Sequence, residues 1–206
     1  MKAHAESRTG NGTGSRGVEM AVPVVVGHPN RVPFAGVLTL VDVPSEKAPA
    51  GARGHRVVLR RLAAEAALPS LMGMAVDFTS QWDGHDARAK CGILTHAAIE
   101  GFELRVRGYL FGRDYPEVEL GIDEHGEGAM GMSYELADAQ VADMRASVWQ
   151  LERVMFTGAA ILLRHKAAYH GTSFRLLGED GGPRRKAARR RPACPSRNAR
   201  GRTTGR

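Results

Sequence analysis

The chain lacks the features that place a protein in a membrane or in an oxidising compartment. No run of 18 apolar residues occurs, so no membrane-spanning helix is expected. The first twenty residues are polar and rich in Gly and Ser, so no secretory leader is expected either. The two cysteines, Cys91 and Cys194, lie far apart, and Cys194 sits among Pro and Arg residues. A structural disulfide is therefore not expected, and a reducing cytoplasm fits the composition.

Several motifs of cofactor-dependent and hydrolytic enzymes are also missing. The sequence has no G-x-x-x-x-G-K-[ST] phosphate loop and no G-x-S-x-G nucleophile elbow. Two cysteines cannot form a zinc site alone, and the spacing of His85, Asp86 and His125 favours no metal. We therefore expect no cofactor, no metal and no α/β-hydrolase.

Positive charge is concentrated in one segment. The formal net charge is +7, but residues 184–206 hold ten Lys and Arg and no Asp or Glu. Removing these ten charges leaves about −3 for the rest of the chain, which is mildly acidic. The segment can neutralise phosphates in a salt-sensitive way, yet it has no aromatic residue for base stacking. We expect weak nucleic-acid contact through this tail rather than a dedicated nucleic-acid-binding protein.

Composition divides the chain into three parts. Residues 1–20 are rich in Gly and Ser and predict a disordered arm. Residues 178–206, dominated by Gly, Pro and Arg, predict a basic disordered tail. Residues 21–177 between them predict one folded domain, which is long enough to bury a core.

Patterning in this domain predicts mostly β-structure with a few helices. Residues 102–110 alternate apolar with largely charged side chains, the clearest strand signal in the chain. Further strands are expected at 21–26, 34–43, 55–59, 90–94 and 148–156. Helices are expected at 60–68 and from a cap at Asp114 to about residue 122, and a short helix or a last turn at 164–169. The apolar stretch 71–78, with Met72 and Met74, is interpreted as core, with a substrate wall as the alternative.

His85 and Ser133 are the residues that suggest chemistry. His85 follows Gly84 in a turn-rich loop, and histidine is the side chain whose ordinary pKa, about 6.5, suits proton transfer at neutral pH. Ser133 lies in a short apolar segment two residues after Gly131, where a nearby amide could face an oxyanion. A serine hydroxyl needs an adjacent base to become a nucleophile. The hypothesis is that the chain folds back to bring the two together.

A third residue would orient the imidazole. Asp86 adjoins the histidine, and adjacent side chains of an extended segment point apart. Glu135 shares the strand face of Ser133, closer to the nucleophile than to the far side of the ring. Glu152 comes from a later segment and meets neither objection, and His96 is a further candidate.

Several segments together resemble the tailed-phage prohead serine proteases, which are similar in fold to the herpesvirus assemblins. The resemblance spans about residues 34–169. Its segments are 34–39 (FAGVLT), 68–71 (LPSL) with Gly73 and Met74, 84–86 (GHD), 131–135 (GMSYE) and 156–162 (FTGAAIL).

The resemblance implies an antiparallel β-barrel with peripheral helices. It places the histidine of the family on His85 and the serine on Ser133. The third member of the family, an acid in a strand, falls on Glu152, within residues 150–154 (QLERV) and ahead of Ala159 and Ala160.

The expected function is that of a serine endopeptidase in phage head maturation. Its substrates would be the scaffold or the major capsid protein precursor, with self-cleavage of its own tails, inside the immature head in the host bacterial cytoplasm. A homo-oligomer is included in this expectation, and a membrane partner is not. The alternative is a non-enzymatic capsid-assembly or scaffold-binding module that uses the same barrel.

Overall fold

A computed structural model of the chain describes residues 16–23, 25–178, 182 and 184. The strands are β1 (Arg16–Glu19), β2 (Val32–Leu40), β3 (Arg56–Leu59), β4 (Ala75–Asp77), β5 (Lys90–Glu100), β6 (Glu103–Leu110), β7 (Met130–Val141), β8 (Val148–Leu163) and β9 (Ser173–Leu176). The helices are α1 (Arg61–Ala67) and α2 (Pro116–His125), with short 3-10 turns η1 (Leu68–Leu71), η2 (Glu127–Ala129) and η3 (Arg164–Lys166). The expectation of mostly β-structure with few helices is therefore confirmed.

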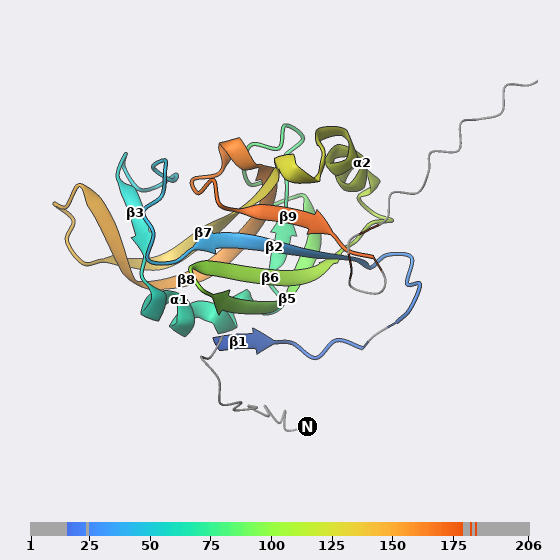
Figure 1. Ribbon diagram of the computed structural model, residues 1–206, viewed down its shortest axis with the longest axis horizontal. Helices are drawn as coiled ribbons and strands as arrows, with labels where there is room; N and C mark the ends of the chain where they lie inside the picture. Colours follow the sequence, from blue (N-terminus) through green and yellow to red (C-terminus); the bar gives the residue numbers. More distant parts are fainter. Residues whose placement is uncertain (1–15, 24, 179–181, 183, 185–206) are drawn as a thin grey trace, which may run out of the picture.

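The strands form one curved sheet (Figure 1). Its order is β3-β8-β4-β5-β6-β2-β9, with β1 added to β5 and β7 added to β8. The prediction of an antiparallel barrel is wrong in two respects. The sheet is open, since β3 and β9 end the path, and it is mixed, since β3 and β4 both run parallel to β8. The reason is that β3 and β4 reach β8 through long connections instead of hairpins, which permits the parallel direction.

The longest strand, β8, organises the part of the sheet that matters for function. Strand β7 pairs antiparallel along one edge of its sixteen residues. The other edge carries β3 at residues 148–151 and β4 at Ala159 and Ala160. Sequence predicted a strand only at 148–156, because the small residues that follow have no period-two alternation. Their small size instead suits a segment that is buried and paired on both edges.

Strands β5, β6 and β2 are antiparallel neighbours, with β6 between the other two. The alternation predicted from residues 102–110 is confirmed in β6, where Leu104, Val106 and Leu110 are buried. Phe102 does not follow the pattern and is 60% exposed, because it lies in the turn before β6. The stretch with Met72 and Met74 packs against the core, as interpreted, and contributes the unpredicted short strand β4.

The two helices lie at opposite ends of the molecule (Figure 1). Helix α1 is confirmed almost as predicted, ending before Pro69. The predicted cap of α2 is wrong: its N-cap is Tyr115, and no side chain caps it. Asp114 instead accepts a hydrogen bond from the Asn30 amide at 2.7 Å.

The N-terminal predictions also need correction. Residues 16–19, assigned by composition to the disordered arm, form β1 along the edge of β5 that β4 leaves open. Gly17 permits this approach, since a Cβ at that position would lie 3.1 Å from the Ala98 Cβ. The described residues of the expected strand 21–26 form no strand. Residues 1–15 of the arm and nearly all of the tail lie outside the described residues.

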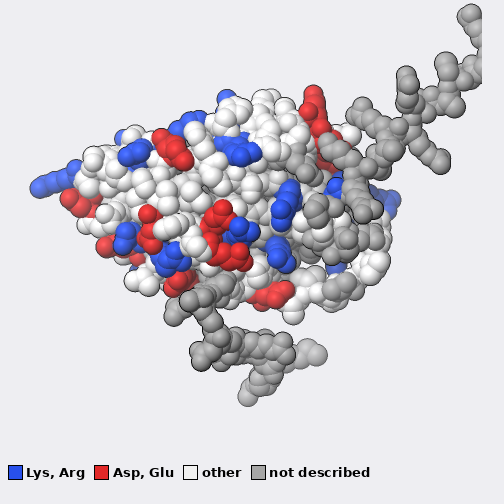
Figure 2. Space-filling model, in the orientation of Figure 1, with Lys and Arg blue, Asp and Glu red and all other residues white. Residues whose placement is uncertain are grey.

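Surface charge on the folded part is mixed in sign. Basic and acidic side chains are interspersed over the face shown in Figure 2. In the part of the chain that the structure describes, no helix combines the length and apolar character needed to cross a membrane.

Candidate active site

His85 lies in the loop that joins β4 to β5, and Trp82 anchors this loop. The Trp82 side chain is buried, stacks on Phe78 at 5.3 Å between ring centroids, and rests against α2. A Cβ at Gly121 of α2 would come within 2.2 Å of the indole, so only glycine leaves room for it. The Trp82 carbonyl accepts a hydrogen bond from the Leu163 N–H at 2.8 Å. The loop is thereby held between α2 and the end of β8.

Local hydrogen bonds shape the rest of the loop. The Thr79 hydroxyl donates to Asp83 at 2.7 Å and accepts from the Asp83 N–H at 3.1 Å. Asp86 accepts a hydrogen bond from the Arg88 N–H at 2.9 Å, and this bond lowers the pKa of the Asp86 carboxyl. Asp86 therefore serves as a turn former rather than as a partner of the neighbouring histidine.

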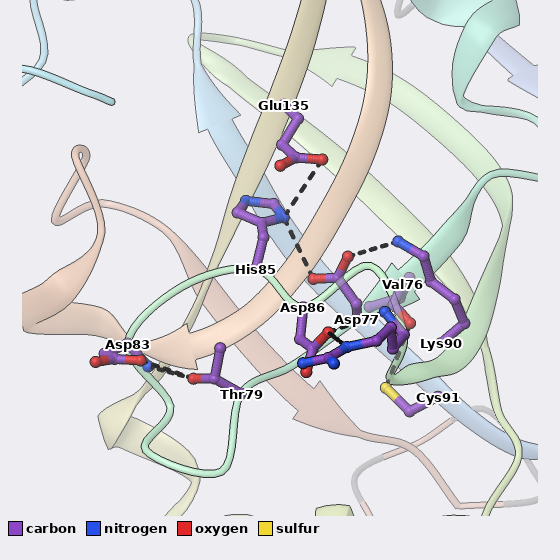
Figure 3. A network of polar contacts seen from close by, with 10 residues as sticks. Val76, Asp77, Thr79, Asp83, His85, Asp86, Lys90, Cys91 and Glu135 are labelled. Atoms are coloured by element: carbon purple, nitrogen blue, oxygen red, sulfur yellow. Dashed lines mark hydrogen bonds and ion pairs between the residues drawn. The ribbon is translucent and has the colours of Figure 1, made fainter. Parts of the chain in front are cut away.

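A buried carboxylate, Asp77, lies beside the imidazole of His85. Asp77 ends β4 and has no exposed surface. Its Oδ1 is 3.3 Å from His85 Nδ1, and its Oδ2 is 2.7 Å from Lys90 Nζ. Glu135 Oε2 lies 4.0 Å from the same Nδ1. Figure 3 shows the ring between the two carboxylates, with Lys90 on the far side of Asp77.

The cluster leaves three buried polar atoms without a hydrogen bond. They are Asp77 Oδ1 and both ring nitrogens of His85, so the 3.3 Å contact is an approach of charge rather than a formed hydrogen bond. Each such atom costs on the order of 1–3 kcal/mol of stability. Native proteins retain few of these atoms, and a catalytic role is one of the reasons for keeping them.

Strand register brings Ser133 to this cluster. Ala160 of β8 pairs with Ser133 of β7 on one side and with Asp77 of β4 on the other. Residues in one row across a sheet project to the same face, and two strand spacings separate the Cα atoms of Asp77 and Ser133 by about 10 Å. Glu135 lies two residues along β7 from Ser133, also on this face. The fold therefore groups the two residues predicted from sequence, His85 and Ser133, around Ala160.

Ser133 and His85 are not hydrogen-bonded to each other. Neither ring nitrogen has a hydrogen-bond partner, and Ser133 is only partly buried. Catalytic hydrogen bonds are often long in ligand-free proteins and shorten when substrate binds. Proton transfer from Ser133 to His85 would therefore require the two side chains to come together when substrate binds.

Glu152 is not brought to the cluster. It is exposed on β8, eight residues before Ala160, which corresponds to about 26 Å along an extended strand. Sequence analysis assigned Glu152 because residues 150–154 match a motif, whereas the acid beside His85 is Asp77. The available signal was an acid at the end of the apolar stretch 71–78, directly before the histidine loop. His96, the other candidate, lies on β5, where its backbone pairs with Glu19 and Arg107. The side chains that approach Nδ1 of His85 are those of Asp77 and Glu135.

Gly131 has a packing role. A Cβ there would lie 2.7 Å from the Thr172 hydroxyl and 3.0 Å from the Arg164 Cα. The glycine thus lets β7 pass close to the segment that follows β8. This close packing explains why a glycine stands at position 131, without a role in binding an oxyanion. No group of three or more His, Cys, Asp or Glu side chains among the described residues is arranged to hold a metal ion.

Comparisons with known proteins give similarity in structure but not in sequence. No protein family matches the sequence, and no curated protein matches it. Among solved structures, the fold is similar to that of the KSHV protease, a herpesvirus enzyme crystallised with a hexapeptide phosphonate inhibitor. The identity is 9%, the TM-score is 0.44, and the match covers 71% of this chain and 65% of the viral protease.

Proposed function

We propose that the protein is a serine endopeptidase with Ser133 as nucleophile, His85 as general base and Asp77 as the residue that orients His85. The observation that carries the proposal is the buried Asp77 carboxylate against Nδ1 of His85, with Ser133 two strands away on the same face. A carboxylate at Nδ1 keeps that nitrogen protonated, which leaves Nε2 as the proton acceptor.

The reaction follows from these positions. The Ser133 oxygen attacks the scissile carbonyl carbon while its proton passes to His85 Nε2. Asp77 stabilises the imidazolium that forms, and Glu135, 4.0 Å from the same nitrogen, adds to that stabilisation. The imidazolium then gives its proton to the leaving amine, and water hydrolyses the acyl-enzyme by the same steps. Lys90 Nζ, 2.7 Å from Asp77 Oδ2, holds this carboxyl group in place from the other side.

The substrate is proposed from the resemblance over residues 34–169. We propose cleavage of the scaffold or of the major capsid protein precursor inside an immature phage head in the bacterial cytoplasm, with self-cleavage of the tails and a homo-oligomeric assembly. The segments that resemble the prohead proteases support this choice of substrate.

A fluorophosphonate probe tests the nucleophile directly, because it labels only an activated serine. Mass spectrometry should find the probe on Ser133 of the wild-type protein, and the Ser133→Ala variant should not be labelled. His85→Ala and Asp77→Asn should slow labelling, the latter by about 10²- to 10⁴-fold, because Asn favours the wrong tautomer. Matched controls are Ser173→Ala, an exposed strand serine, and Glu152→Gln, and both should label at the wild-type rate.

A non-enzymatic assembly module is the second candidate. The observation in its favour is that Ser133 and His85 are not hydrogen-bonded to each other. Co-expression with the capsid protein separates the two functions. If the protein is a peptidase, the capsid protein should carry new termini created by cleavage, and these should be missing when the Ser133→Ala variant is co-expressed. If wild-type protein and Ser133→Ala both bind the capsid protein and leave its termini the same, the module is favoured.

A further inference from the structure

A cavity of about 470 Å³ lies beside the loop that carries His85. It opens between that loop and α2, and Phe78, Trp82 and Leu120 form its apolar lining. Trp82 is buried on its other sides, whereas Leu120 is 65% exposed. The size falls within the range of ligand-binding pockets in proteins.

Carboxylates surround this apolar lining. Asp86 comes from the histidine loop, and Glu117 and Glu124 come from α2. Within the described residues, Arg88 pairs with Asp86, and no ion pair involves Glu117 or Glu124. A cavity with an apolar floor and an acidic rim suits a long side chain with a cationic end, which can bury its methylene stem and keep its charge at the rim.

A cation of the tail already contacts the same helix. Arg184, the first residue of the basic tail, forms an ion pair with Glu119 of α2. Glu119 lies between Glu117 and Leu120 in the sequence of the helix, so the tail starts within one turn of the cavity. Residues 185–206 that follow hold nine Lys and Arg and no acid, and an extended chain of that length spans about 70 Å. Helix α2 is only about 15 Å long, so every part of the cavity is within reach of the tail.

We propose that the C-terminal segment 185–206 docks in this cavity, with a Lys or Arg stem against Trp82 and Leu120 and its charge on Glu117 and Glu124. Tethering through Arg184 raises the effective concentration of the segment to the millimolar range, so a weak contact suffices. The attraction is electrostatic at the rim and weakens with salt.

The tail contains a natural reporter of this docking, Cys194. Leu120→Cys places a thiol at the cavity, while Cys91 is buried with a pKa raised to about 12 by burial and stays unreactive. A short bis-maleimide should join the introduced thiol to Cys194 within one chain, as read from digestion and mass spectrometry of full-length protein. The matched control is Leu62→Cys, which replaces a 78% exposed leucine on α1 at the other end of the molecule.

We expect cross-linking at position 120 to be about tenfold faster than at position 62, because only the docked segment gains effective concentration. Glu117→Gln with Glu124→Gln, or 0.5 M NaCl, should remove the difference, whereas Asp123→Asn on the same helix should not. Equal rates at positions 120 and 62 would overturn the proposal. Cross-links formed only between two chains would overturn it too, and would assign the cavity to a second copy. None of these readouts depends on peptidase activity.

Discussion

Lys90 is the counter-charge of a carboxylate that solvent does not reach, so its removal tests the candidate site without an activity assay. In Lys90→Met the stem length is kept and the ammonium is lost. Asp77, fully buried, would retain only the 3.3 Å approach of His85. Breaking a buried ion pair from one side costs about 3–5 kcal/mol. Because the Lys90 side chain is 36% exposed, solvent screening reduces this cost, and we expect about 2–3 kcal/mol.

The assay is urea unfolding followed by fluorescence of Trp82 and Trp149. The matched control is Arg88→Met, which removes the partner of Asp86 in the same loop. That arginine is 92% exposed, and exposed pairs contribute at most about 1 kcal/mol. The double variant Asp77→Asn with Lys90→Met should recover part of the loss, because no uncompensated charge remains. If Lys90→Met costs no more than Arg88→Met, Asp77 is not a buried charge and cannot serve as the orienting acid.

Three further outcomes are expected. Gly121→Ala should push Trp82 off α2 and cost about 1–3 kcal/mol in urea unfolding; an unchanged free energy of unfolding would contradict the anchoring of the loop. Burial raises the pKa of Tyr134 and of Tyr169 above the ordinary value of about 10, so the neutral forms favour the folded state. The stabilisation from these two groups is then fully present below pH 10, and the free energy of unfolding falls above it by at most about 2.7 kcal/mol per pH unit. In urea unfolding measured between pH 9 and 11, Tyr169→Phe should make the free energy of unfolding depend less steeply on pH. Burial raises the pKa of the Cys91 thiol to about 12, so Cys91 should react with an aromatic disulfide reagent at pH 8 only after unfolding. The measurement uses Cys194→Ser protein, in which Cys91 is the one remaining thiol, and fast reaction of the folded protein would refute the burial of Cys91.

Local patterns were sufficient where one face of a segment meets water. The alternation in β6 and the composition of α1 predicted both elements, because each signal is contained within a few neighbouring residues. His85 and Ser133 were chosen from residue type and setting, and the fold groups them on one face of the sheet. Their catalytic role stays a prediction until the labelling experiment is done.

The identity of the third residue depends on contacts that no short pattern contains. Asp77 precedes His85 by eight positions in a stretch that reads as core, and it reaches the imidazole only because β4 pairs parallel to β8 at Ala160. Glu152 fits a sequence motif but lies on a distant part of the same strand, since an extended strand separates its residues by about 3.3 Å each. Strand direction and register are set by long-range pairing and by the loops that connect the strands. Sequence therefore pointed by residue type to a candidate base and a candidate nucleophile, and tertiary structure alone decided which carboxylate stands beside the imidazole.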